Sequence, residues 1–330
     1  MWHSRDEGFV SRVLVTGASG FIGRAVVSAL QATSVPVTAA VRRDNTFPPD
    51  VRVTRVHDLG ATTEWTHALR DCDTVVHCAA RVHVMQEHAG DPLDAFRVAN
   101  VIGSLRLAEQ AATAGVRRFV YISSIKVNGE RTAPGAPFTE WSAPAPSDPY
   151  GVSKWEAEQQ LRIVADAHQL ELVIIRPPLV YGPGVRANFL SMTRWIQRGI
   201  PLPFASVTSN RRTLVGLDNL VDLILACVSH RRAAGETFLA GDGDDLSTAE
   251  LLNRTARALG VQSRLVPVPE RLLAGAASLL GRQSLWQRLG GTLQASITHA
   301  RETLGWQPPV TVDEGLRRAV AEIRTRQDTP

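Results

Sequence analysis

Residues 13–23 read VLVTGASGFIG, and this stretch decides the fold. The apolar run VLV predicts a short buried strand, and apolar residues that recur at helical spacing after the turn predict a helix. The turn between them carries Gly17, Gly20 and Gly23 in the pattern G-x-x-G-x-x-G. Glycines let the backbone approach a pyrophosphate closely, and a helix N-terminus offers N–H groups and partial positive charge to it. The stretch therefore predicts nucleotide binding.

The composition is that of a soluble enzyme. The chain has 330 residues, of which 44% are hydrophobic and 21% charged, enough for one large domain or two smaller ones. A net charge of +4 suits anionic ligands, but arginine pairs are scattered along the chain, so we do not expect nucleic acid as a partner. The three cysteines show no metal-binding spacing, and no metal is expected.

The chain shows neither a secretory signal nor a membrane span. Its longest apolar run near the C-terminus, residues 272–280, is too short to cross a bilayer, so we expect no membrane insertion. With an odd number of cysteines and no secretory core, the sequence favours a cytoplasmic location.

Strand and helix patterns alternate after the glycine turn. This alternation predicts an α/β fold of the Rossmann type, a doubly wound parallel sheet whose ligand lies beyond the carboxyl ends of the strands. The expected strands are residues 13–15, 35–41, 51–56, 74–77, 119–122 and 172–175, with helices over 100–114 and from Tyr150 onward. The domains we expect are a nucleotide-binding domain over 1–178, with returning elements near 214–240, and a smaller C-terminal α/β substrate domain over 179–330.

Arg42 follows the second strand, about twenty residues past the glycine turn, where the ribose of the adenosine is met in a dinucleotide fold. A carboxylate at this position accepts hydrogen bonds from a free 2′-hydroxyl, whereas an arginine fits a 2′-phosphate. We therefore expect NADP(H) in preference to NAD(H).

Tyr150 and Lys154 lie one turn apart on the same face of a predicted helix, and Ser124 ends a predicted strand. A tyrosine that transfers a proton near neutral pH needs its pKa, roughly 10, brought down. The ammonium of Lys154 and the positive nicotinamide ring of an oxidised cofactor would both favour the phenolate. Joined to the glycine turn, these three residues predict a catalytic site in which Lys154 also holds the nicotinamide ribose.

The motifs together resemble the extended short-chain dehydrogenase/reductases, in the branch of nucleotide-sugar epimerases, dehydratases and reductases. The resemblance rests on TGASGFIG, Asp58–Leu59, HCAA, Asn100, SSIKVNG, YGVSK, RPPLVYGPG, RTLVGLDNL and LGWQPP, which lie between about residues 13 and 309. It is closest to bacterial enzymes of surface-polysaccharide and O-antigen sugar synthesis that reduce UDP-2-acetamido-2,6-dideoxy-hexos-4-ulose to UDP-N-acetylquinovosamine. These enzymes are often labelled UDP-glucose 4-epimerases.

The resemblance implies further site residues. Ser124 would hydrogen-bond the sugar oxygen at the reacting carbon. The cofactor would contact Gly17, Gly20, Phe21, Ile22, Gly23, Arg42, Asp58, Leu59, Ala79, Ala80, Tyr150, Lys154 and Pro177. The substrate would contact Arg81, His83, Ser124, Lys126, Asn188 and Arg212, the last two gripping its diphosphate. A guanidinium at position 212 suits phosphate oxygens on its own chemistry as well. The same resemblance implies a homodimer formed through the helices over 100–114 and 150–167.

Three positions depart from relatives of this type. Sugar dehydratases of the branch place an Asp-Glu pair after the catalytic serine or threonine, and here those positions hold Ile125 and Lys126, so dehydration is not expected. Many epimerases carry asparagine where this chain has Leu179, so one substrate contact is missing or replaced.

We therefore expect a reductase that acts with NADPH on the C4 ketone of a UDP-linked 4-keto-6-deoxy-N-acetylhexosamine. The first alternative is a 4-epimerase of UDP-glucose or UDP-N-acetylglucosamine with bound NAD. Reductases of steroids or flavonols, and a non-catalytic dinucleotide sensor, are further alternatives. Two other features have structural interpretations: His77 is expected to be a hydrogen-bonded core histidine, and the tryptophans to serve packing.

Overall fold

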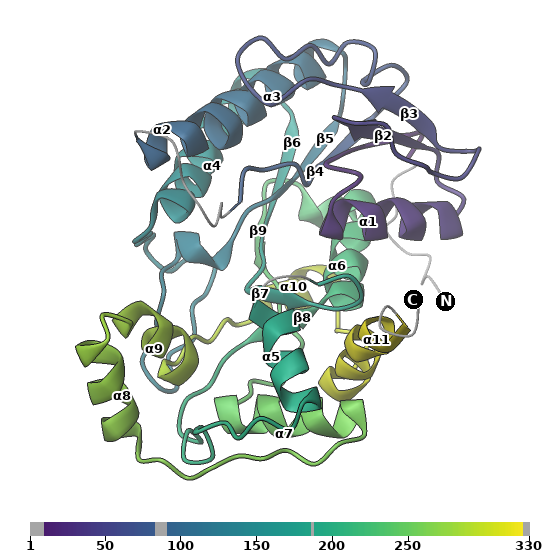
Figure 1. Cartoon of the computed structure of the whole chain (residues 1–330). Coiled ribbons are helices and arrows are strands. Elements are labelled where there is room, and N and C mark those ends of the chain that lie inside the picture. Colours follow the sequence, from purple (N-terminus) through teal and green to yellow (C-terminus); the bar gives the residue numbers. More distant parts are fainter. Residues whose placement is uncertain (1–9, 83–90, 186–187, 326–330) are drawn as a thin grey trace.

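A seven-stranded parallel sheet forms the centre of the computed structural model, which describes residues 10–82, 91–185 and 188–325. Figure 1 shows the sheet with helices on both of its faces. Its strands are β1 (Val13–Thr16), β2 (Val37–Val41), β3 (Arg52–Arg55), β4 (Thr74–His77), β5 (Arg118–Ile122), β6 (Glu171–Arg176) and β9 (Thr237–Leu239). Their order is β3-β2-β1-β4-β5-β6-β9, and every neighbouring pair is parallel. The doubly wound Rossmann-type fold predicted from the sequence is confirmed.

The order of the strands reverses at β1. This strand pairs with β2 on one side and with β4 on the other, so that Val13 lies in register with Val37 and with Thr74. In open parallel sheets a crevice forms beyond the carboxyl ends of the strands where the order reverses. The glycine turn follows β1 directly, and the fold therefore places it at this crevice.

Each face of the sheet has its own hydrophobic core. Helices α1 (Phe21–Ala32) and α6 (Leu217–Ser229) cover one face, where Val26, Leu30, Leu220 and Ile224 are buried. Helices α3 (Gly103–Thr113) and α4 (Pro149–His168) cover the other face, together with the fully buried Trp65. All five residues of β2 and of β5 are buried, as expected for strands covered on both sides.

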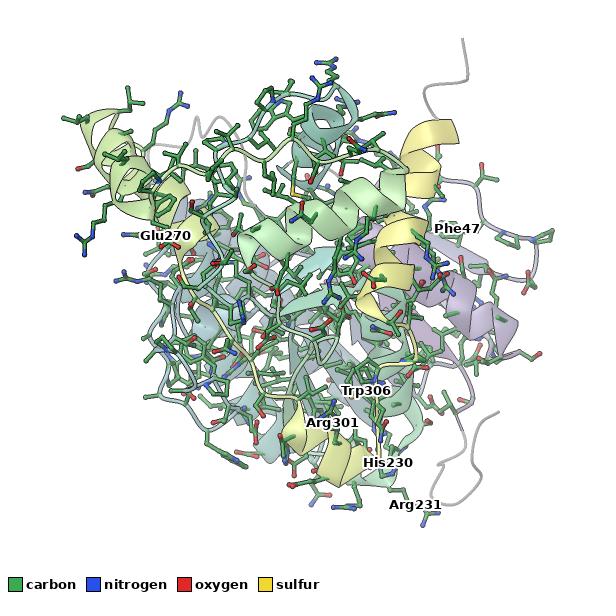
Figure 2. The ribbon with its side chains drawn as sticks, turned by 90° about the horizontal axis from the view of Figure 1, so that it is seen from below. Phe47, His230, Arg231, Glu270, Arg301 and Trp306 are labelled. Atoms are coloured by element: carbon green, nitrogen blue, oxygen red, sulfur yellow. The ribbon has the colours of Figure 1, made fainter. Side chains whose placement is uncertain are left out.

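The C-terminal part builds a second, smaller unit below the sheet (Figure 1). Strands β7 (Leu179–Tyr181) and β8 (Leu214–Gly216) pair in parallel, and α5 (Asn188–Gln197), α7 (Thr248–Leu259) and α11 (Val312–Thr325) pack around them. Helices α8 (Glu270–Leu279) and α9 (Gln283–Gly290) follow, and α10 (Thr298–Leu304) returns to the main sheet. Trp306, labelled in Figure 2, follows α10 and packs in the core on the α6 face of the sheet, where its indole Nε1 donates to Asp222 Oδ1 over 2.7 Å.

The structure differs from the prediction at the helix expected over residues 100–114. The helical segment begins earlier, as α2 (Pro92–Phe96), because the Asp91 carboxylate accepts from the backbone N–H of Leu93 and Pro92 begins the helix. It continues through a six-residue π-helix, η1 (Arg97–Ile102), before α3. The sequence analysis also missed β7, α9 and α10, which are short and carry little periodicity.

The two-domain division remains a proposal. Strand β9 and helix α6, both within the predicted returning segment 214–240, join the nucleotide-binding part. Helix α10 packs there too, whereas β8 pairs with β7 outside the main sheet. Within the part of the chain that the structure describes, none of the helices has the length and apolar character that crossing a bilayer requires.

Arg118 fastens the returning helix α6 to the sheet. Its guanidinium is almost fully buried, and Nη1 donates to the carbonyl oxygens of Cys227, Val228 and His230 at 2.9, 3.0 and 2.9 Å. The Nε atom donates to Glu171 Oε2 over 2.8 Å. One side chain thus satisfies the carbonyl groups that the end of α6 leaves without helical partners.

We predict that Arg118→Met lowers the free energy of unfolding by about 3–5 kcal/mol, because three carbonyl groups lose their buried charged donor and Glu171 loses one of its two arginine partners. The neighbouring Arg117→Met is the matched control: Arg117 also pairs with Glu171, over 2.8 Å, but is partly exposed. Its loss should cost less than about 1 kcal/mol. Urea denaturation of both variants measures the difference, and equal losses would contradict the role assigned to Arg118.

Candidate active site

The glycine turn is packed so closely that side chains cannot enter it. Gly17 has φ +62°, and a Cβ atom there would lie 2.9 Å from Cα of Ala79. A Cβ atom on Gly23 would lie 2.2 Å from the carbonyl oxygen of Gly17. The N–H of Gly20 donates to that same carbonyl oxygen over 2.8 Å, and Gly20 is the N-cap of α1. This cradle of bare backbone at a helix N-terminus fits a dinucleotide pyrophosphate.

The segment after β4 closes the other side of the cradle. His77 is fully buried; its Nδ1 atom is hydrogen-bonded to Thr16 Oγ1 over 2.6 Å, and its Nε2 atom to Ser104 Oγ over 2.8 Å. The N–H of Ala79 also donates to Thr16 Oγ1, over 3.2 Å. Burial and the nearby Lys154 lower the pKa of His77 to about 3. His77 is therefore a neutral core histidine, and this interpretation from the sequence is confirmed.

Ser124, Tyr150 and Lys154 come from two neighbouring elements. Ser124 follows β5 and is largely buried, and its hydroxyl accepts from the N–H of Lys126 over 3.3 Å. Tyr150 and Lys154 occupy the first two turns of α4, which Asp148 caps by accepting from the N–H of Gly151 over 2.7 Å. A hydrogen bond joins Ser124 to the hydroxyl of Tyr150.

The protein's own groups do not produce the lowered tyrosine pKa that the sequence analysis expected. Burial raises the pKa of Tyr150 to about 12, the charge of Asp148 adds to the rise, and the hydrogen bond with Ser124 opposes it. The Nζ atom of Lys154 lies 4.1 Å from the ring centroid of Tyr121, as a cation–π contact. From the protein side alone, the phenol of Tyr150 is therefore held protonated at neutral pH.

A buried polar network, which the sequence analysis missed, surrounds this triad. Glu158 lies one turn beyond Lys154 on α4 and is fully buried. It accepts from Ser123 Oγ over 2.5 Å and from the Nε and Nη2 atoms of Arg176 over 3.0 and 2.6 Å. The Nη1 atom of Arg176 donates to Asn128 Oδ1 over 3.1 Å. The i, i+4 spacing of Lys154 and Glu158 was the available sequence signal.

Asn100 is a second residue that the sequence analysis did not assign to the site. It is buried in η1, and its amide donates to Ser153 Oγ and to the carbonyl oxygen of Arg81, both over 3.0 Å. Its Oδ1 atom accepts from the N–H of Arg81 over 2.8 Å. Asn100 therefore ties the segment after β4 to the helix that carries Tyr150.

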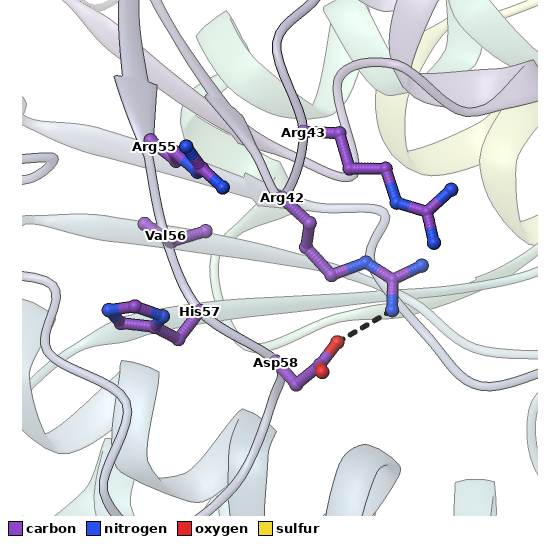
Figure 3. A pocket seen from close by; sticks show the side chains of 6 residues that line it. All are labelled: Arg42, Arg43, Arg55, Val56, His57 and Asp58. Carbon is purple, nitrogen blue, oxygen red and sulfur yellow. Dashed lines mark hydrogen bonds and ion pairs between the residues drawn. The ribbon is translucent and has the colours of Figure 1, made fainter.

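A basic cavity of about 280 Å³ lies where the adenosine part of the cofactor is predicted to bind. It is lined by Arg42, Arg43, Arg55, Val56, His57 and Asp58 (Figure 3). Arg42 Nη1 pairs with Asp58 Oδ1 over 2.7 Å, and both side chains are exposed. Leu59, the next residue, packs against α3, where a Cβ atom on Gly103 would lie 2.7 Å from its own Cβ. The structure thus gathers the predicted Arg42 and Asp58 in one cavity, and it adds Arg43 and Arg55.

The predicted substrate contacts are less uniform. Lys126 pairs with Asp148 and, over 3.0 Å, with Glu130, and its contact with substrate stays a prediction. Arg212 Nη1 donates to the carbonyl oxygen of Gly291 over 3.1 Å. Burial lowers the pKa of Arg212, which the charge of Glu130 opposes.

The remaining predicted residues take simple positions. Phe21 and Ile22 begin α1, Ala80 follows Ala79, and the carbonyl oxygen of Pro177 accepts from the N–H of Ile125 over 3.0 Å. The guanidinium of Arg81 lies 5.8 Å from the ring centroid of Phe96. Asn188 begins α5, its side chain lying outside the described structure, and His83 lies outside the described residues.

Lys154 gives a pH dependence that can be measured. Burial lowers its pKa from 10.5 to about 7, and the charge of Glu158 opposes that shift. At a pH between these two pKa values, Lys154 carries the proton in the unfolded chain and lacks it in the folded chain. The residue therefore makes the free energy of unfolding rise with pH. The rise should reach about 1.4 kcal/mol per pH unit.

We therefore predict that the unfolding free energy of the wild type, relative to that of Lys154→Met, increases over this interval. Urea denaturation at a series of pH values checks it, and the buried cysteines and tyrosines cancel because both proteins carry them. Parallel curves for the two proteins would show that Lys154 does not titrate as described.

Comparisons with known proteins identify the family. The family model described as "NAD dependent epimerase/dehydratase family" matches residues 13–241. A Vibrio cholerae protein named UDP-glucose 4-epimerase is 45% identical over 313 residues, which cover 95% of this chain and 95% of the relative. A Mycolicibacterium smegmatis protein of the same name is 30% identical over 336 residues, which cover 96% of this chain and 99% of the relative.

A solved structure supports the same assignment. MoeE5 in complex with UDP-glucuronic acid and NAD matches with a TM-score of 0.77 and 27% identity, covering 96% of this chain and 100% of that chain. The family match takes in the glycine turn, the segment after β4, Ser124, Tyr150 and Lys154. This chain belongs to the NAD dependent epimerase/dehydratase family of enzymes.

Proposed function

We propose that this protein is an NADPH-dependent reductase of the C4 ketone in a UDP-linked 4-keto-6-deoxy-N-acetylhexosamine, for surface-polysaccharide or O-antigen sugar synthesis. The observation that carries the proposal is the cavity lined by Arg42, Arg43 and Arg55. Three guanidinium groups and one carboxylate favour a 2′-phosphate over a free 2′-hydroxyl. A cofactor that is consumed and exchanged suits a reductase, whereas an epimerase regenerates its own.

The proton chemistry of the site fits reduction. When bound, the dinucleotide supplies the hydride. Tyr150, with its pKa raised to about 12, is protonated at neutral pH and can donate its proton to the carbonyl oxygen as negative charge develops there. Ser124 hydrogen-bonds the same oxygen, and both groups stabilise charge that exists only as the reaction proceeds. We also assign to α4 the role of holding Lys154 close to the nicotinamide ribose.

Elimination of water finds little support at this site. Ile125 has no ionisable group, and the amine of Lys126 is held by Asp148 and Glu130. A dehydratase needs both an acid and a base next to the substrate at this step.

The second candidate is a 4-epimerase acting on UDP-glucose or UDP-N-acetylglucosamine with bound NAD. The name and 45% identity of the Vibrio cholerae relative favour it. An epimerase would use the same Ser124, Tyr150 and Lys154, first oxidising C4 and then reducing the other face of the rotated keto-sugar. The two candidates differ in net redox change.

A direct assay separates the two. We expect the purified protein to oxidise NADPH in the presence of the UDP-4-keto sugar and to yield a UDP-6-deoxy sugar, identified by mass and NMR. Tyr150→Phe should lose at least about 100-fold in turnover while NADPH binding changes little, because only the proton donor is removed. Interconversion of UDP-glucose and UDP-galactose without added reductant would instead establish the epimerase. Full activity of the variant would contradict both candidates.

The cofactor preference has its own test. Arg42→Ala should weaken NADPH binding by about tenfold or more, through loss of a charge-assisted contact with phosphate, and leave NADH binding nearly unchanged. Arg52→Ala is the matched control, since Arg52 lies on the same strand as Arg55 but pairs with Asp71 over 3.2 Å. Isothermal titration with both nucleotides measures the effect, and equal weakening of NADH and NADPH would refute the assignment of Arg42.

A homodimer is the assembly that we propose, with α3 and α4 at its interface. Ile163 on α4 is 60% exposed, and an apolar side chain at that position suits helix pairing between two copies. A cytoplasmic location remains a prediction from the sequence.

A further inference from the structure

Helices α8 and α9 form a hairpin, residues 270–290, at the margin of the molecule. The two helices pack against each other, and no residue of α8 is buried. Figure 1 shows the hairpin beside the smaller unit, away from the main sheet, and Figure 2 shows α8 projecting outward beyond Glu270. The chemistry proposed above makes no use of α8.

The apolar side of α8 faces solvent. Leu272, Gly275, Ala276 and Leu279 recur at helical spacing and are all exposed, Leu272 by 64% and Leu279 by 90%. A Cβ atom built on Gly275 meets nothing within 4 Å. Leu280, which follows the helix, is 72% exposed. A surface helix normally turns its apolar stripe toward the protein core, and here the stripe has no partner within the described structure.

Basic side chains border this stripe. Arg271 lies on the exposed side of α8, and Arg282 is exposed in the turn between α8 and α9. Glu270, the one acidic residue of the hairpin, accepts a hydrogen bond from Ser209 Oγ over 3.2 Å and is thereby turned toward the body of the protein. The outward surface of the hairpin therefore combines leucines with positive charge.

We propose that α8 lies on an anionic lipid surface, with Leu272, Leu279 and Leu280 in the acyl boundary and the arginines at the headgroups. An amphipathic helix of this composition binds in the plane of a membrane through buried apolar area and attraction to anionic lipid. The run 272–280 is too short to span a bilayer, so the helix lies on the surface and does not cross it. This inference does not rest on the proposed reaction.

A second copy of the chain fits the hairpin less well. In a two-fold pairing the same surface meets itself, and Arg271 and Arg282 would then face like charges without carboxylates to offset them. One ten-residue helix also offers little area against the roughly 800 Å² per partner of a stable interface. Neither objection applies to anionic lipid headgroups, because they carry the opposite charge and a single amphipathic helix can bind in the plane of a membrane.

Vesicle sedimentation with the full-length protein tests the proposal. We expect the wild type to sediment with vesicles that contain phosphatidylglycerol, and to do so less at high salt. With vesicles of phosphatidylcholine alone, the protein should stay in the supernatant. Leu272→Glu/Leu279→Glu should weaken binding by at least about tenfold, with turnover and melting temperature unchanged because both side chains are exposed. Arg257→Glu, an exposed position on α7, produces the same change in net charge and should bind as the wild type does.

Three outcomes would overturn the proposal. They are a wild type that does not bind anionic vesicles, a double variant that binds them like the wild type, and an Arg257→Glu variant that loses binding equally. Light scattering on the same proteins covers the other occupant: if the double variant lowers the oligomeric mass and vesicle binding is absent, the stripe is an interface between copies of the chain.

Discussion

The buried ion pair between Glu158 and Arg176 is the interaction on which the arrangement of the active site depends. It joins α4 to the end of β6, and through Ser123 and Asn128 it holds both ends of the segment that carries Ser124. Neither charged side chain is more than 3% exposed, so breaking the pair would leave a buried charge uncompensated, at a cost of about 3–5 kcal/mol. The pair therefore holds α4, the end of β6 and the segment that carries Ser124 in a fixed arrangement.

The same burial fixes the protonation states around the pair. Lys154, one turn before Glu158, loses part of its basicity to desolvation, while the Glu158 carboxylate restores some of it. His77 is held neutral and Tyr150 protonated, both chiefly by desolvation. The resting site therefore holds a ready proton donor beside a lysine poised near neutral pH, an arrangement that serves a reductase directly. An epimerase would begin by removing a proton, for which the raised pKa of Tyr150 must first be overcome by the bound cofactor.

The sequence predicted the sheet, which the structure confirms, and it grouped Ser124, Tyr150 and Lys154, because both predictions depend on local patterns. VLVTGASGFIG encodes strand, turn and helix within a few residues, and Tyr150 and Lys154 share a helix face by spacing alone. Asn100 entered the sequence analysis only through the family resemblance and without a role, since a π-helix has no simple periodic signature and the contact with Arg81 exists only in the fold. The ion pairs of Lys126 with Asp148 and Glu130 were likewise out of reach, because Asp148 lies 22 residues away in the sequence and only the fold brings it to the amine.

Burial also makes the groups around the proton donor less tolerant of substitution than the groups expected to meet the cofactor's adenosine. The ion pair between Arg42 and Asp58 is exposed on both sides, at 71% and 84% of the side chains, so it contributes at most about 1 kcal/mol. Arg42 can leave Asp58 for a phosphate at little cost, and a substitution at either position would alter cofactor preference without disturbing the core. Glu158 and Arg176 have no such freedom, because both are buried and the Nε and Nη2 atoms of Arg176 both donate to the Glu158 carboxylate. The buried pair therefore constrains the groups that handle the proton, while the exposed arginines after β2 and on β3 are the residues that we expect to govern the choice between NADP(H) and NAD(H).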